Sequence, residues 1–154
     1  MSDLVATFAP VSVPLRDWLR EHFTPVDTDA NGTKMVYVAG VPSAAYDANG
    51  TLRGTAVTLY TAGGTSGGTA LDRPFCRFNV MDPVASVAEA AAYTLRSTLE
   101  HIAPGTRLGL AADPSDVRLV GADTAVPLWS PDLDLPGSSR FVVTTTLTVQ
   151  AVGV

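Results

Sequence analysis

The most regular alternation of apolar and polar residues lies at the end of the chain, in residues 140–152. Odd-numbered positions there are mostly apolar, and even-numbered positions include Thr144, Thr146, Thr148 and Gln150. A period of two is that of a strand with one buried face. Shorter runs of this kind predict further strands at residues 34–41, 55–62, 75–80, 107–112 and 116–120.

Two stretches change to the spacing of a helix. Residues 12–23 predict a short helix, and residues 87–102 predict a long one. The short helix has an apolar stripe of Leu15, Trp18, Leu19 and Phe23; that of the long helix is Val87, Ala91, Leu95, Thr98, Leu99 and Ile102. Ser86 and Glu89 have the spacing of a capping box before the long helix, and Pro104-Gly105 ends it.

The alanine-rich part of the long helix, residues 88–92, predicts that it lies close against a sheet. The predicted order is helix, strands, helix, strands. We therefore expect an α+β fold, in which a mostly antiparallel sheet carries one long and one short helix on one face.

Turn and loop signals divide the remaining sequence. Asp-Ala-Asn-Gly-Thr occurs twice, at residues 29–33 and 47–51, and Asn-Gly favours the positive φ angles of a tight turn. Residues 24–53 are therefore expected to form a hairpin-like excursion before the main sheet. The glycine-rich residues 63–68 predict a flexible loop. A second, proline-containing loop is expected at residues 121–139.

Composition adds a prediction about assembly. A chain of 154 residues with 46% apolar residues is expected to be a single domain, 1–154, with a real core. Only 16% of the residues are charged, which predicts that other subunits cover part of the surface. The net charge of −5 argues against a protein that grips nucleic acid. We expect no membrane span and no signal peptide, and the lone Cys76 suits a reducing compartment.

For each candidate metal or phosphate site, a solvated turn or loop explains the residues better than a binding site. Asp27, Asp29 and Asn31 match the first half of a calcium-binding EF-hand loop, but Val38 stands where the loop needs glutamate. The glycine-rich residues 63–68 are not followed by the lysine of a phosphate-binding loop. We expect solvated turns here, and neither a metal nor a cofactor.

Candidate catalytic groups are equally sparse. Cys76 is expected to be buried in a strand, and His22 and His101 lie at predicted helix ends. Asp132 and Asp134 alternate with leucines, a pattern that favours a solvated loop over a pair of acid–base carboxylates. The sequence therefore predicts a protein that is not an enzyme.

The order of these elements resembles the tail terminator, or tail completion, proteins of long-tailed bacteriophages, particularly those of actinobacterial hosts. The similar features begin with Trp18-Leu19-x-x-x-Phe23 and a strand that runs into Gly-Gly-Thr at residues 63–65. They continue with Asp72-Arg73-Pro74 before a strand, the alanine-rich helix, and a Pro-Asp loop that leads to Arg140-Phe141. The resemblance covers about residues 55–154 and, more loosely, the first helix.

The resemblance implies a structural protein of the virion that is made in the host cytoplasm. Its copies, usually six, would form a ring that caps the tail tube and joins it to the head–tail connector. Genomic DNA would pass through the lumen without specific binding. The expected contact residues are Gly63, Gly64, Gly67, Gly68, Trp129, Asp132 and Arg140. Trp129 fits a loop anchor equally well.

Two other interpretations stay open at this point. The chain could be another neck protein, such as a stopper, an adaptor or a minor tail protein, because these share much of the same element order. It could also be a small ligand-binding or enzymatic α+β domain, which would need titratable groups that converge in a pocket.

Overall fold

The computed structural model describes residues 10–24, 28, 32–66, 71–108, 117–131 and 138–150. These residues form an α+β fold with two α-helices, α1 (Ser12–His22) and α2 (Ala85–Glu100), and a short 3-10 turn, η1 (Ser43–Ala45). The seven strands are β1 (Val36–Val38), β2 (Ala56–Ser66), β3 (Leu71–Asp82), β4 (Thr106–Arg107), β5 (Arg118–Thr124), β6 (Leu128–Trp129) and β7 (Ser139–Gln150).

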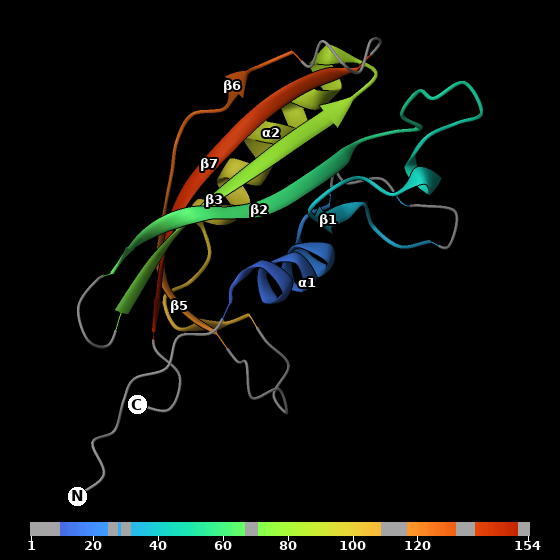
Figure 1. Cartoon of the computed structure of the whole chain (residues 1–154). Coiled ribbons are helices and arrows are strands. Elements are labelled where there is room, and N and C mark those ends of the chain that lie inside the picture. Colours follow the sequence, from blue (N-terminus) through green and yellow to red (C-terminus); the bar gives the residue numbers. More distant parts are fainter. Residues whose placement is uncertain are drawn as a thin grey trace, which may run out of the picture.

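The strands form one sheet in the order β1-β2-β3-β7-β5-β4. The pairing of β1 with β2 is parallel, and the other strand pairs are antiparallel. β5 and β6 share one edge of β7, because β5 pairs with residues 145–150 and β6 with residues 141–142. In Figure 1, β2, β3 and β7 run side by side and α2 lies behind them.

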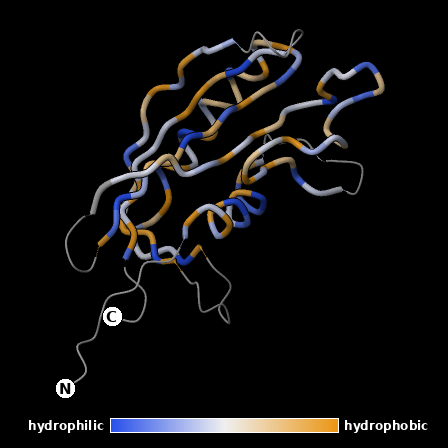
Figure 2. Tube along the Cα trace, viewed as in Figure 1, coloured by the Kyte–Doolittle hydropathy of each residue, from blue (hydrophilic) through white to orange (hydrophobic). Residues whose placement is uncertain are grey.

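The core lies between the sheet and the two helices, which are on the same side of it. Figure 2 shows hydrophobic residues recurring along the strands. Phe78 of β3 faces this side and is fully buried, with Leu59 of β2 and Val143 of β7 opposite it. The odd-numbered positions of β7 from Phe141 to Val149 are all buried, which confirms the period-two prediction for this strand.

α2 is rotated relative to the stripe that the sequence predicted. Its buried residues are Ala88, Ala91, Ala92, Leu95 and Leu99. Val87 was predicted to be buried, but it is 44% exposed, so this part of the prediction is wrong. Successive helical residues lie about 100° apart, so packing Ala88 against the sheet turns Val87 away from it.

The predicted capping box is also wrong. α2 begins at Ala85, so Ser86 and Glu89 lie inside the helix, and no side chain caps it at Val84. Instead, the buried carboxylate of Asp82 holds this end. Its Oδ1 accepts a hydrogen bond of 2.8 Å from the Val84 N–H, and its Oδ2 accepts one of 2.7 Å from the Thr55 hydroxyl.

The predicted glycine-rich loop is largely strand. β2 continues through residues 61–66 and pairs with the start of β3 after a bulge between Thr61 and Gly64. Gly64 has a φ of +143°, and a Cβ there would lie 2.8 Å from the Cα of Pro74. Only glycine fits this close approach of two strands. The bulge accommodates the extra residues, so the pairing of β2 with β3 continues beyond it.

The second Asp-Ala-Asn-Gly-Thr repeat, residues 47–51, closes a tight turn, as predicted, and an antiparallel bridge joins Tyr46 to Leu52 beside it. A bridge between Thr28 and Lys34 flanks the first repeat, of which residues 29–31 lie outside the described residues. The rest of the excursion differs from a hairpin, because the strand predicted at residues 34–41 shrinks to β1 and pairs with β2 in parallel.

The C-terminal half also departs from the predicted boundaries. Of the strand predicted at residues 107–112, residues 109–112 lie outside the described residues, and β4 covers its first residue. β5 runs to residue 124 rather than 120. Residues 121–139 were predicted to be a loop, yet they include the end of β5 and all of β6. Pairing with the long β7 draws the end of β5 and the two residues of β6 into the sheet, which local sequence signals do not reveal.

Candidate functional site

An exposed apolar edge surrounds β6. Val126 is 58% exposed, Leu128 65% and Trp129 59%. Among the described residues, β6 pairs only with β7, so its outer edge offers unpaired backbone groups beside these side chains. Such a combination of apolar surface and an open strand edge is typical of a protein contact. We call Val126, Leu128 and Trp129 the β6 edge.

Arg140 holds the β6 edge in place. Its Nε donates a hydrogen bond of 2.8 Å to the Ser130 carbonyl, while the Ser130 N–H donates one of 2.9 Å to the Arg140 carbonyl. The residue that anchors this segment is therefore Arg140, and Trp129 is not a buried loop anchor. Asp132, another expected contact residue, lies outside the described residues, as do Gly67 and Gly68.

The sheet face that points away from the helices is a second candidate surface, which we call the open face. Neither described helix packs on it. Apart from the buried Thr58, Met81 and Val142, its side chains are partly exposed, whereas those on the helix side are almost completely buried. The strand registers assign to it Tyr60, Arg73, Phe75, Arg77, Asn79, Arg118, Asp123, Arg140, Thr144, Thr146 and Thr148.

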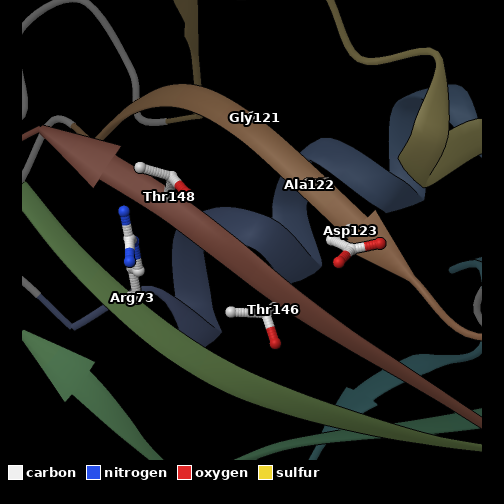
Figure 3. A pocket seen from close by; sticks show the side chains of 6 residues that line it. All are labelled: Arg73, Gly121, Ala122, Asp123, Thr146 and Thr148. Atoms are coloured by element: carbon white, nitrogen blue, oxygen red, sulfur yellow. The ribbon is translucent and has the colours of Figure 1, made fainter. Parts of the chain in front are cut away.

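The open face contains a hollow of about 450 Å³ that crosses three strands. Figure 3 shows Arg73 of β3, Thr146 and Thr148 of β7 and Asp123 of β5 around it. Gly121, after a bulge in β5, also lines it and presents no side chain. The hollow is thus a shallow polar depression in a sheet.

Arg77 occupies the middle of the open face. Its guanidinium carbon lies 6.0 Å from the ring centre of Tyr60, within the range of a cation–π contact. Its Nε is buried and has no hydrogen-bond partner within the described part of the chain. A buried donor without a partner is unfavourable, and a contact that supplied an acceptor would relieve it.

The outer side of α2 is the third candidate surface. Val84, Val87 and Tyr93 are about half exposed there. Arg96 Nε lies 3.3 Å from the Glu100 carboxylate, a pairing of residues four apart along the helix. We call this exposed side, which also carries Glu89, the outer face of α2.

The titratable residues do not form a catalytic arrangement in the described residues. Burial raises the pKa of the Cys76 thiol to about 12, so it stays protonated and is a poor nucleophile. His22 Nδ1 donates to the Trp18 carbonyl at 2.8 Å, and His101 Nδ1 donates to the Ser97 carbonyl at 2.6 Å. Each imidazole thus bonds to its own helix.

Metal-ligating side chains are also not gathered into a site in the described part of the chain. Asp27, Asp29 and Asn31 lie outside it, and Val38, which stands at the glutamate position of the calcium motif, belongs to β1. Neither α1 nor α2 is long and apolar enough to cross a membrane.

Sequence reasoning placed Glu89, Tyr93, Arg96 and Glu100 on one polar side of the helix, but it named neither this side nor the open face as a contact surface. The period-two pattern of β3 already places Arg73, Phe75 and Arg77 on one side, but only the sheet order shows which strands flank them. Of the expected contact residues, Gly63 and Gly64 lie in β2, Trp129 lies in β6, and Arg140 bonds to the next residue, Ser130.

Comparison with known proteins gives a similarity of fold. No family model matches the chain, and no curated protein matches it. Among solved structures, it is similar to a chain in a structure described as "Virion of native gene transfer agent (GTA) particle". The TM-score is 0.49 and the sequence identity 23%, over 75% of this chain and 78% of that chain.

Proposed function

We propose that this chain is a structural virion protein that forms a ring, usually of six copies, on the end of a bacteriophage tail tube. The observation that carries the proposal is a sheet with helices on one side only, whose surface offers three different contact areas. These are the open face, the outer face of α2 and the β6 edge. The order of sequence motifs, which resembles tail terminator proteins, supports the same function.

A ring needs two different surfaces that fit each other. Such head-to-tail contacts close into a ring when the rotation between neighbours is right. The open face and the outer face of α2 are suitable, because they lie on opposite sides of one sheet–helix layer. The low charged fraction of 16% agrees with a chain whose surface is partly covered by its neighbours.

The β6 edge suits a contact with the tube or the connector. Tryptophan is among the side chains that contribute most to protein interfaces, and Trp129 is exposed on a short strand fixed by Arg140. A terminator has to differ on its two sides. One side binds the last tube ring, and the other offers no complementary surface to a further tube subunit, so growth stops without any bond being cleaved.

Passage of DNA through such a ring fits the charge of the chain. The net charge is −5, yet four of the nine arginines lie on the open face. If neighbouring copies cover that face, the remaining surface is more acidic than the sequence average. An acidic lumen repels phosphate and lets DNA slide without specific binding.

Deletion of the protein from the phage tests the function. We expect heads and tails that are not joined, tails of irregular length, and packaging that proceeds normally. Electron micrographs of the lysate give the first two results, and the protected DNA in the heads gives the third. Joined particles with normal tails would contradict the proposal. A ring found elsewhere in the neck would instead identify a stopper or adaptor.

A point variant makes the same test more specific. Trp129→Ala removes an exposed side chain and should leave the circular dichroism spectrum and the melting temperature unchanged, while it impairs joining. Val13→Ala, at a residue that is 49% exposed on α1, is the matched control and should join normally. Normal joining by Trp129→Ala would remove the β6 edge from the proposed contact.

A further inference from the structure

The open face has an uneven charge. Of the described residues assigned to it, four are arginines and only Asp123 is acidic. Arg73 and Arg118 are exposed, and Arg73 makes no ion pair with Asp123 in the described structure, although both line the same hollow. Because Arg77 also has a buried Nε that lacks an acceptor, this surface fits a partner that supplies carboxylates.

The outer face of α2 has the opposite pattern. Glu89, Arg96 and Glu100 follow one another at intervals of seven and four residues, which puts them on one side of the helix. The two glutamates are eleven residues apart, or roughly 16 Å along the axis. Arg73 and Arg77 are four residues apart in β3, or roughly 13 Å. The spacings match within the reach of these side chains.

The apolar groups of the two surfaces are also compatible. Beside its charged residues, the outer face of α2 carries Tyr93 and the small residues Ala90 and Ser97, so another backbone can approach it closely. The open face offers Phe75, Tyr60 and the methyl groups of the β7 threonines. A helix of this kind packs on a flat sheet, as the opposite side of α2 already does on its own sheet.

We propose that the outer face of α2 of one copy docks on the open face of the next copy, and that this contact builds the ring. The inference deepens the proposed function and rests on it. Glu89 and Glu100 would bind arginines on the open face of the neighbour. Arg96, which lies between them along the helix, would face Asp123, the acidic residue among the described residues of that open face.

A second copy fits better than a separate partner because one chain carries both complementary surfaces. They lie on opposite sides of the same layer, so each copy presents one surface to each neighbour. A contact made only by arginines could also bind phosphate groups. However, the Asp123 carboxylate lies in the same hollow as Arg73 and repels phosphate, whereas a protein surface can supply a cation for it.

Charge reversal on each surface tests the contact. One variant carries Arg73→Glu and Arg77→Glu on the open face, and the other carries Glu89→Arg and Glu100→Arg on α2. The matched control, Lys34→Glu with Arg53→Glu, has the same net charge as the first variant, but its changes lie near β1. Association of the full-length proteins is measured by analytical ultracentrifugation at low salt and at about 1 M salt, where charges are screened beyond roughly 3 Å.

We expect wild type and control to associate at low salt, and each charge-reversal variant to associate at least about tenfold more weakly. An equimolar mixture of the two variants should recover association. The glutamates introduced on the open face of one variant then meet the arginines introduced on α2 of the other, while the reverse contact stays native. Circular dichroism of each variant verifies the fold. Only a head-to-tail contact between these two surfaces gives recovery on mixing.

Several results would overturn the contact. They are a wild-type chain that stays monomeric at low salt, a control that weakens as much as the variants, or variants that do not recover on mixing. Binding of a single-stranded oligonucleotide that Arg73→Glu with Arg77→Glu abolishes would also overturn it. None of these results removes the ring itself, which a map of the assembled particle tests independently.

Discussion

Truncation of Leu95 measures how firmly α2 is attached to the sheet. Leu95 is fully buried, and α2 packs against β3, β5 and β7. Its neighbours on the buried stripe are mostly alanines, which are too short to fill a cavity. We therefore expect Leu95→Ala to cost about 3–5 kcal/mol, the upper part of the usual range for this change.

A loss of this size is a large fraction of the stability of an ordinary domain, about 5–15 kcal/mol. For a chain of this length it lowers the melting temperature by roughly 6–20 °C, at about 2–4 °C per kcal/mol. The free energy of unfolding is measured by urea titration of wild type and variant. An unchanged slope with a lower midpoint would show that only stability has changed.

Val87→Ala is the control that decides the orientation of the helix. The sequence pattern puts Val87 on the buried stripe, whereas in the structure it is 44% exposed. Its truncation should cost less than about 0.5 kcal/mol, because alanine is also the better helix former. Glu100→Ala, which loses only the surface pair with Arg96, should be similarly mild. Losses for Val87→Ala equal to those for Leu95→Ala would refute this orientation.

Three further predictions concern single positions. Gly64→Ala should cost roughly 1–3 kcal/mol in thermal unfolding because its φ is +143° and β3 occupies the space of a Cβ, whereas Gly121→Ala should be nearly neutral. The Cys76 thiol, whose pKa is raised from 9.0 to about 12, should resist thiol reagents at pH 8 until the protein unfolds. Between about pH 9 and 12 the thiol is protonated in the native state but ionised in the unfolded state, so the free energy of unfolding falls as the pH rises. Cys76→Ala should reduce this fall. Thr55→Val should cost roughly 1–3 kcal/mol in urea, since it leaves the buried Asp82 carboxylate without one donor; a neutral result would mean that water replaces the hydroxyl.

Elements with a strong local period follow from the amino-acid sequence alone. In β7, four of the five odd-numbered residues from 141 to 149 are apolar, and the burial of this side follows directly from that pattern. Asn-Gly determined the tight turn at residues 47–51, because positive φ angles are local properties of the backbone. The apolar stripe of α1 was also readable, with Leu15, Leu19 and Phe23 fully buried.

The tertiary structure decided the features that depend on a partner distant in sequence. The glycines of β2 look like a loop, yet they become strand because the start of β3 pairs with them. In place of the expected capping box, Asp82 accepts a hydrogen bond from the Val84 N–H at the start of α2. The Thr55 hydroxyl, 27 residues earlier in the chain, holds this carboxylate in position. The buried and exposed sides of the alanine-rich α2 differ little in hydrophobicity. The rotation of α2 about its own axis is therefore set by close packing against the sheet rather than by its sequence pattern.

The same distinction applies to the candidate contact surfaces. The sequence identified Trp129 and Arg140 individually, but only the pairing of β6 with β7 brings Ser130, the residue after Trp129, within hydrogen-bonding distance of Arg140. The open face is assembled from the consecutive strands β2 and β3 together with β5 and β7, which come only after α2. Its arginines gather because strand order, which long-range pairing sets, determines which side chains share a face.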